Sequence, residues 1–131
     1  FIATSTGITP YRAMLPELNK RLLANPKLHV VILQGVQTHE DLLYHDEFLA
    51  FANTHPRVTY RAQLSREKPD ALQANEYTGY VQNSFPELNL NPEEDMVYLC
   101  GNPGMVDESF SDLKDRGFAI QRIVREKYIS R

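Results

Sequence analysis

Small hydroxylated residues surround a glycine near the start of the chain, in the stretch FIATSTGITPYRAML. A short apolar run precedes them and a segment with helical spacing follows, so the loop joins a strand to a helix. The start of a helix presents unpaired N–H groups and a favourable dipole, which together hold a phosphate. Ser5, Thr6, Gly7 and Thr9 therefore form a candidate phosphate loop. On the motif alone, a capped turn without a ligand is an equally good interpretation.

Two further loops carry residues suited to nucleotide contacts. Arg66 follows Ser65 just after an apolar segment, and an arginine fork beside a hydroxyl can grip a phosphate dianion. Such a tripeptide by itself is more often a solvated turn. Tyr80 is a candidate for stacking on a planar ring, although packing in a core is the commoner use of a tyrosine. Gln82 is either a cofactor contact or a surface residue.

Cys100 ends an apolar run and precedes a glycine-rich turn. A buried cysteine usually behaves as a small hydrophobic residue, and a thiol nucleophile needs a base that the neighbouring sequence does not supply. Covalent thiol catalysis is therefore not expected. The four histidines, at positions 29, 39, 45 and 55, show no metal-ligand spacing that also recruits this cysteine, so we predict no metal site.

The elements that must position these loops alternate between strands and helices. The predicted strands are 1–3, 28–33, 58–64, 96–100 and 120–129. The predicted helices are 10–24, with a cap at Thr9 and an irregularity near Pro16, then 40–53 after a cap at Thr38, and 105–116, while 65–77 is a polar loop. This order predicts an α/β, doubly wound, mainly parallel five-stranded sheet with helices on both faces, a Rossmann-like fold. Ligands of such sheets bind at the carboxyl ends of the strands, where these loops converge.

Composition limits the classes of partner. The 131 residues, 42% of them hydrophobic, fit one domain over 1–131, which we expect to be monomeric. A net charge of −3, with acids and bases interspersed, gives no footprint for nucleic acid or for an anionic membrane. One cysteine and no long apolar run favour a cytoplasmic protein. Because Phe1 opens the chain at the end of an apparent strand, we expect an N-terminally truncated fragment of a larger flavoenzyme.

Taken in order, five blocks resemble a known family over nearly the whole chain. The blocks are FIATSTGITPYRAML, LQGVQTHEDLLYHDEF, YRAQLSREK, YTGYVQ and VYLCGNPGMVDE. Together they resemble the NADP(H)-binding domain of the ferredoxin–NADP(H) reductase family. In that family the first loop holds the cofactor pyrophosphate, a role that the resemblance assigns to Thr6, Gly7, Ile8, Thr9 and Pro10.

The same resemblance implies roles in the later blocks. The family's Ser–Arg pair binds the adenosine 2′-phosphate and its later tyrosine stacks on adenine; these roles fall on Ser65, Arg66 and Tyr80, with Gln82 in the same block as the tyrosine. NADPH is therefore implied over NADH. The family's CGxxGM motif falls on Cys100, Gly101, Gly104 and Met105, where the cysteine lies against the nicotinamide without covalent attachment.

The end of the chain resembles the family less closely. Many members end in a Glu-x-aromatic sequence whose ring covers the flavin, which Glu126 and Tyr128 match. Residues 129–131 extend beyond this position, as in some bacterial members, and Tyr128 is then a strand residue with the flavin covered differently. The family also usually has glycine where Ser5 stands.

The resemblance implies hydride transfer between NADP(H) and FAD, with ferredoxin or flavodoxin as the electron partner. Family members hold FAD mainly in an N-terminal β-barrel that this sequence does not supply, so we expect the isolated chain to bind NADPH without reductase activity. One alternative is an NADH-linked reductase component or a cytochrome b5 reductase-like domain, which commonly lack the Ser–Arg pair. Another is a non-enzymatic nucleotide-binding domain.

Overall fold

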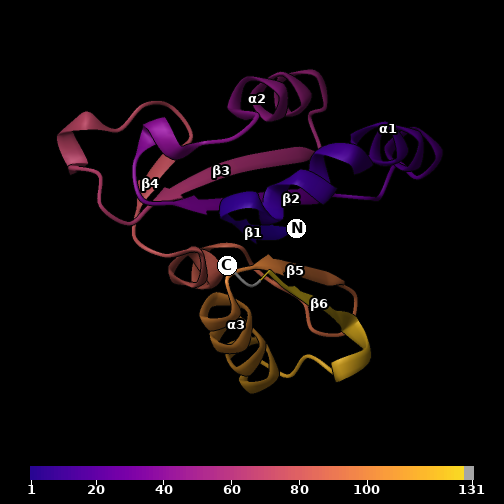
Figure 1. Ribbon diagram of the computed structural model, residues 1–131. Helices are drawn as coiled ribbons and strands as arrows, with labels where there is room; N and C mark the ends of the chain where they lie inside the picture. Colours follow the sequence, from indigo (N-terminus) through magenta and orange to yellow (C-terminus); the bar gives the residue numbers. More distant parts are fainter. Residues whose placement is uncertain (129–131) are drawn as a thin grey trace.

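A computed structural model describes residues 1–128 (Figure 1). The strands are β1 (Ile2–Thr4), β2 (Val30–Val36), β3 (Val58–Leu64), β4 (Glu76–Thr78), β5 (Val97–Gly101) and β6 (Ile123–Lys127). The α-helices are α1 (Thr9–Ala24), α2 (His45–Thr54) and α3 (Pro103–Asp115). Short 3-10 helices are η1 (Ser5–Ile8), η2 (His39–Asp41), η3 (Pro69–Ala71), η4 (Val81–Glu87) and η5 (Ile120–Arg122).

All strands pair in parallel, in the order β4-β3-β2-β1-β5-β6 (Figure 1). From β1 the chain winds outward through β2 to β4 and then returns to the other side of β1 as β5. Ala3 in β1 lies opposite Gln34 on one side and Cys100 on the other. The order of strands therefore reverses between β1 and β5, which is where sheets of this kind bind their ligands.

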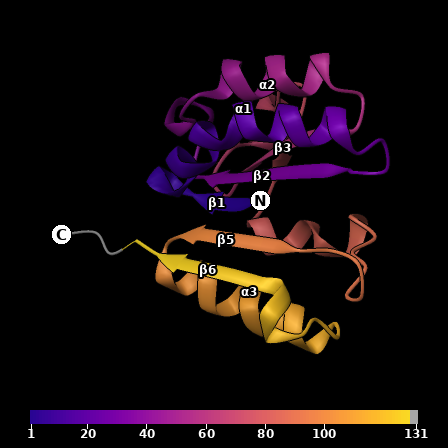
Figure 2. The same ribbon diagram turned by 90° about the vertical axis from the view of Figure 1, so that its right-hand side faces the viewer.

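Helices cover both faces of the sheet, as Figure 2 shows, with α1 and α2 on one side and α3 on the other. Alternate strand residues supply two hydrophobic cores. Ile32 belongs to the core under α1 and α2, whereas its neighbour Leu33 belongs to the core under α3 and η4. Both side chains are about 1% exposed, so each face of the central sheet is closed. The predicted doubly wound α/β architecture is confirmed.

The sheet has a sixth strand that the sequence analysis did not predict. Strand β4 begins within the polar stretch 65–77, which was predicted to be a loop, and ends one residue beyond it; it pairs with β3 through Ala62 opposite Glu76. Only three residues long and mostly exposed, this edge strand has no hydrophobic alternation of its own. Its pairing depends on the preformed edge of β3, which local sequence does not encode.

The predicted second helix, 40–53, is divided in the structure. Residues His39–Asp41 form the separate 3-10 turn η2, and Tyr44 then adopts a left-handed conformation (φ 57°) before α2 begins at His45. The predicted Thr38 cap takes the form of a capping box with Asp41, whose carboxylate accepts a hydrogen bond from the backbone N–H of Thr38 at 3.1 Å. This capping box stands at the start of η2, however, and not at the start of a long helix.

The ends of other elements also differ from the prediction. Helix α1 begins at Thr9 after η1, no side chain caps it, and it continues without interruption through Pro16. Helix α3 begins two residues earlier than predicted, at Pro103, because Asn102 caps it. The predicted last strand, 120–129, is shorter, since 120–122 form η5, and position 129 lies outside the described residues.

Within residues 1–128, no helix combines the length and the apolar character that crossing a membrane requires.

Ser5 adopts a left-handed backbone conformation, with φ 51°. A left-handed conformation costs a residue with a Cβ atom about 1–2 kcal/mol, which glycine would recover. The greater freedom of glycine in the unfolded chain reduces this gain in stability by about 0.5–1 kcal/mol. We predict that Ser5→Gly raises the free energy of unfolding by about 0.5–1 kcal/mol, measured by urea unfolding followed by circular dichroism.

Ser111→Gly is the matched control, because Ser111 lies exposed within α3. There the same change should lower the free energy of unfolding by about 0.5 kcal/mol. A loss of stability in Ser5→Gly comparable to that of the control would contradict the assigned backbone strain.

Candidate functional site

A cleft of about 810 Å³ opens at the carboxyl ends of the strands. Its walls come from the loops that follow the strands and from the start of α3. The lining residues are Thr4, Ser5, Thr6, Gly35, Val36, Gln37, Asp41, Leu43, Gln63, Ser65, Gly79, Tyr80, Val81, Gln82, Asn102, Gly104, Met105 and Glu108. The volume is in the range that small-molecule and cofactor sites occupy.

The structure brings only part of the predicted site to the surface of this cleft. The predicted residues that line it are Thr6, Ser65, Tyr80, Gln82, Gly104 and Met105. The predicted residues outside the lining are Gly7, Ile8, Thr9, Pro10, Arg66, Cys100, Gly101, Glu126 and Tyr128. Tyr80 is 65% exposed, so its ring lies free at the cleft and is not used in the core.

The first loop reaches the cleft through Ser5 and Thr6, while the next two residues anchor it. A Cβ atom on Gly7 would lie 2.3 Å from the carbonyl oxygen of Cys100, so only glycine allows the loop to pack on β5. Ile8 is fully buried in the core under α1. Gly7 therefore brings the backbone of the first loop close to β5.

Gly101 joins the ends of β5 and β1. Its φ is +138°, and a Cβ atom there would lie 2.4 Å from the hydroxyl oxygen of Thr4. That hydroxyl accepts a hydrogen bond from the backbone N–H of Asn102 at 2.9 Å. Thr4 thus fixes the turn between β5 and α3, a role that its position in the sequence did not reveal.

Ser65 and Arg66 leave β3 along the loop that follows β2. The backbone N–H of Ser65 donates to Val36 at 3.0 Å, and that of Arg66 donates to Gln37 at 2.8 Å. Arg66 is exposed, and among residues 1–128 its guanidinium takes part in no ion pair. Backbone hydrogen bonds therefore hold Ser65 and Arg66 at the edge of the cleft. Within residues 1–128, no carboxylate pairs with the Arg66 guanidinium.

Two buried amide oxygens in residues that line the cleft have no hydrogen-bond partner among residues 1–128. Oε1 of Gln63 is one, and its Nε2 is directed to the carbonyls of Thr78 (3.2 Å) and Tyr80 (3.3 Å). Oε1 of Gln82 is the other, and its Nε2 donates to Glu108 at 2.7 Å. An unpaired buried acceptor costs about 1–3 kcal/mol, so the cleft fits a ligand that carries N–H or O–H donors, as nicotinamide nucleotides do.

Gln63 was missed by the sequence analysis, and so was Asn102. The only available signal for Gln63 was a polar residue inside a run of buried strand positions. Asn102 caps α3 by accepting from the backbone N–H groups of Gly104 (2.8 Å) and Met105 (3.3 Å). Its signal was the preference of asparagine for the N-cap position with proline directly after it.

Cys100, Glu126 and Tyr128 meet at the other edge of β5. Cys100 lies opposite Glu126 in the β5–β6 register, and the backbone N–H of Tyr128 donates to Gly101 at 2.7 Å. Burial raises the pKa of the Cys100 thiol, although a hydrogen bond with Tyr128 acts in the opposite direction. The thiol is therefore protonated at neutral pH, which suits a packing contact and not a nucleophile.

Comparison with known proteins finds similarity to oxidoreductases and electron-transfer components. The family model for the oxidoreductase NAD-binding domain matches residues 1–109. Ferredoxin–NADP reductase B of Sorangium cellulosum is 41% identical over 112 residues, covering 81% of this chain and 43% of that protein. The toluate 1,2-dioxygenase electron transfer component of Pseudomonas putida is 32% identical over 127 residues, covering 97% of this chain and 36% of that protein.

A solved structure extends the similarity to the fold. A mutant of ferredoxin–NADP⁺ reductase from Plasmodium falciparum, crystallised with 2′P-AMP, has a TM-score of 0.70 at 26% identity, covering 98% of this chain and 52% of that one. The chain spans 43% and 36% of the length of the two curated relatives.

Gly101→Ala tests the close approach of β5 and β1. The substitution combines a left-handed conformation, at about 1–2 kcal/mol, with overpacking against Thr4, at about 1–3 kcal/mol. We predict that the free energy of unfolding falls by about 3 kcal/mol, measured by urea unfolding.

Gly104→Ala is the control for this prediction. A Cβ atom at Gly104 would lie 3.1 Å from the side-chain oxygen of Asn102, with no other heavy atom within 4 Å beyond its chain neighbours and its own helix. The control should stay within about 1 kcal/mol of the parent, as most substitutions without a specific clash do. Equal effects of the two substitutions would contradict the role assigned to Gly101.

Proposed function

This chain belongs to the family of oxidoreductase NAD-binding domains, and from that premise we propose that it is the NADP(H)-binding domain of a flavin-dependent ferredoxin– or flavodoxin–NADP(H) reductase. The cleft at the carboxyl ends of the strands carries this proposal, because Thr6, Ser65 and Tyr80 line it and the exposed Arg66 directly follows Ser65. Its unpartnered amide oxygens add acceptors for the amino and hydroxyl groups of a nucleotide.

The adenosine end of the nucleotide lies at the loop after β3. Arg66 supplies a charged fork for a 2′-phosphate, and Ser65, which lines the cleft, adds a hydroxyl donor. Tyr80 presents a free ring to the adenine. The reductase from Plasmodium falciparum, which has a similar fold, was crystallised with 2′P-AMP, and this supports NADP(H) as the ligand.

The pyrophosphate lies against the first loop. Thr6 offers a hydroxyl and an exposed backbone at the cleft, and Thr9 and Pro10 form the first turn of α1, whose dipole favours an anion. Gly7 and Ile8 contribute by fixing this loop against β5 and the core. Gly7 and Ile8 thus anchor the loop, and Thr6 faces the ligand.

The nicotinamide end lies where β5 turns into α3. Gly104 and Met105 line the cleft there, Gly101 fixes the preceding turn against Thr4, and in our proposal the neutral Cys100 thiol, behind the lining, positions the ring without bonding to it. Gln82 accepts a hydrogen bond through its free oxygen, and Glu126 and Tyr128 close the opposite edge of β5. When bound, the nicotinamide nucleotide supplies or accepts the hydride that passes to or from the flavin.

The complete enzyme is larger than this chain in our proposal. The aligned segments cover 43% and 36% of the two curated relatives, and we place FAD binding in the remainder of such a protein. The chain alone then binds the nucleotide without reductase turnover. We further propose a cytoplasmic monomer whose electron partner is ferredoxin or flavodoxin.

An NADH-linked electron-transfer component is the second candidate. It is supported by the similarity to the toluate dioxygenase component over 97% of this chain. Asp41 also lines the cleft, and a carboxylate there favours a ribose diol and repels a 2′-phosphate. The two candidates differ in which charge, that of Arg66 or that of Asp41, faces the adenosine ribose.

Calorimetric titration with 2′-phospho-AMP and 5′-AMP, at fixed salt, separates these candidates. An arginine–phosphate hydrogen bond is worth about 1.5–3 kcal/mol, so 2′-phospho-AMP should bind at least about tenfold more tightly. Arg66→Ala should remove this preference while leaving 5′-AMP binding unchanged.

Lys20→Ala is the charge-matched control, since Lys20 lies exposed on α1 outside the cleft. It should retain the full preference for the 2′-phosphate. Equal binding of the two ligands by the parent protein would favour the NADH-linked candidate, and binding of neither would indicate a degenerate domain and contradict the proposed nucleotide site.

A further inference from the structure

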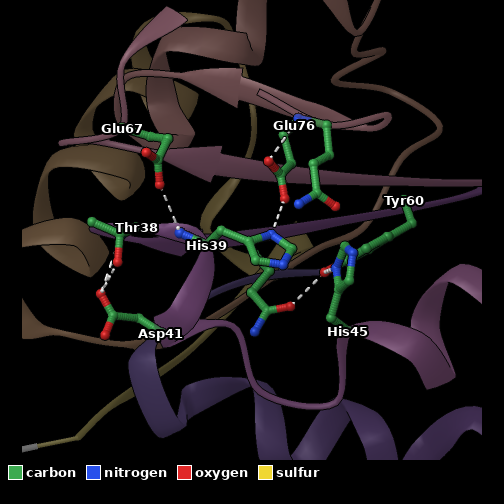
Figure 3. A network of polar contacts seen from close by, with 9 residues as sticks. Thr38, His39, Asp41, His45, Tyr60, Glu67 and Glu76 are labelled. Atoms are coloured by element: carbon green, nitrogen blue, oxygen red, sulfur yellow. Dashed lines mark hydrogen bonds and ion pairs between the residues drawn. The ribbon is translucent and has the colours of Figure 1, made fainter. Parts of the chain in front are cut away.

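A second group of polar side chains lies away from the nucleotide cleft, beside the loop after β2. It contains His39 from η2, His45 from the start of α2 and Glu76 from β4, none of which lines the cleft (Figure 3). One ligand atom from each residue lies within 4.8 Å of the others. The spacing of the histidines and Cys100 in the sequence gave no sign of Glu76 as a ligand. Only the pairing of β4 with β3 brings Glu76 to the histidines.

We propose that His39, His45 and Glu76 bind one divalent transition-metal ion, for which we name Zn²⁺. Two imidazoles and one carboxylate form a ligand set that zinc accepts, with water in the fourth position of a tetrahedron. Zinc–ligand bonds of about 2.0–2.2 Å require ligand atoms roughly 3.3 Å apart, so the group must contract by about 1.5 Å at most. The proposal is independent of the nucleotide-binding function.

Glu76 is already directed at the histidines. Its side chain is fully buried, one carboxylate oxygen contacts Nδ1 of His39, and the other accepts a hydrogen bond from the backbone N–H of Gln73 at 2.9 Å. A buried carboxylate requires a partner of opposite charge. A bound ion would take the place of the proton shared between His39 and Glu76, and that proton would be released to solvent.

His45 is held beside this pair by the sheet. Its Nδ1 lies 3.2 Å from the hydroxyl of Tyr60, and that hydroxyl donates to Gln34 at 2.7 Å. The amide nitrogen of Gln34 donates in turn to the carbonyl of Leu43 at 3.0 Å, which fixes the orientation of the amide. Outer contacts of this kind orient the ligands of metal sites.

Solvent and charge give an ion access to the group. A hollow of about 480 Å³ is lined by both histidines and by three carboxylates, those of Glu40, Asp46 and Glu47. Glu47 forms an ion pair with Arg12 at 2.8 Å, and the negative charge of Glu40 and Asp46 raises the local concentration of cations. The backbone also supports the arrangement, because the left-handed Tyr44 turns the chain so that His45 starts α2 next to His39.

A bound ion would join three elements that share little apolar packing. The edge strand β4, the turn η2 and the start of α2 would all be fixed to one centre. Because the ion binds only the folded chain, the melting temperature should rise with zinc concentration.

The test uses chelator-dialysed protein without a histidine tag, titrated calorimetrically with ZnCl₂ and checked by elemental analysis. We expect one zinc per chain. Glu76→Gln, which keeps the size of the side chain and its acceptor for Gln73, and His45→Gln should each weaken binding by on the order of a hundredfold. Circular dichroism of both variants checks that they fold.

Two control variants should bind zinc as the parent does. His29→Gln removes a histidine outside the group, and Cys100→Ser removes the only thiol. The proposal is overturned if the parent binds no stoichiometric zinc, if Glu76→Gln and His45→Gln bind it normally, or if Cys100→Ser abolishes binding. Titration of the zinc-free protein with 2′-phospho-AMP then tests the nucleotide site separately.

Discussion

The carboxyl ends of β1 and β5 approach so closely that two positions exclude any side chain, and the site depends on this constraint. A Cβ atom at Gly7 would meet the carbonyl of Cys100 at 2.3 Å, and one at Gly101 would meet the hydroxyl of Thr4 at 2.4 Å. Gly7, in η1 directly after β1, and Gly101, the last residue of β5, therefore lie on two sides of the same junction. Because the strand order reverses at this junction, closing it also forms the crevice in which ligands of such sheets bind.

Two buried glutamines from neighbouring strands show how the floor of the cleft differs from the core. Both polar groups of Gln34 are satisfied, since its nitrogen donates to Leu43 and its oxygen accepts from Tyr60. The amide nitrogen of Gln63 instead donates to two carbonyls, those of Thr78 and Tyr80, while its amide oxygen has no hydrogen-bond partner in the described part of the chain. The first pattern is that of a structural amide, and the second leaves an acceptor open at the cleft.

The local sequence predicted the elements that are marked by their own hydrophobic pattern. It did not predict the elements whose structure is determined by tertiary contacts. The buried runs of β2, β3 and β5 are visible because both faces of a central parallel strand are covered. Strand β4 and the division before α2 are not visible, since one needs the edge of β3 and the other a left-handed Tyr44. In the site, the order of motifs found Ser65 and Tyr80, but Gln63 carries no motif and is recognisable only by its unpaired oxygen.

The acidic neighbour of Arg66 explains how this arginine stays available. Glu67 follows it directly, and a free carboxylate there would compete with a phosphate for the guanidinium. Glu67 instead accepts a hydrogen bond from the backbone N–H of His39 at 3.1 Å, which binds it to η2 (Figure 3). The Glu67 carboxylate is thus held by η2, and among residues 1–128 it forms no ion pair with Arg66. In the function that we propose, selectivity for a 2′-phosphate depends on η2 in two ways, because its backbone holds Glu67 and its Asp41 lines the cleft.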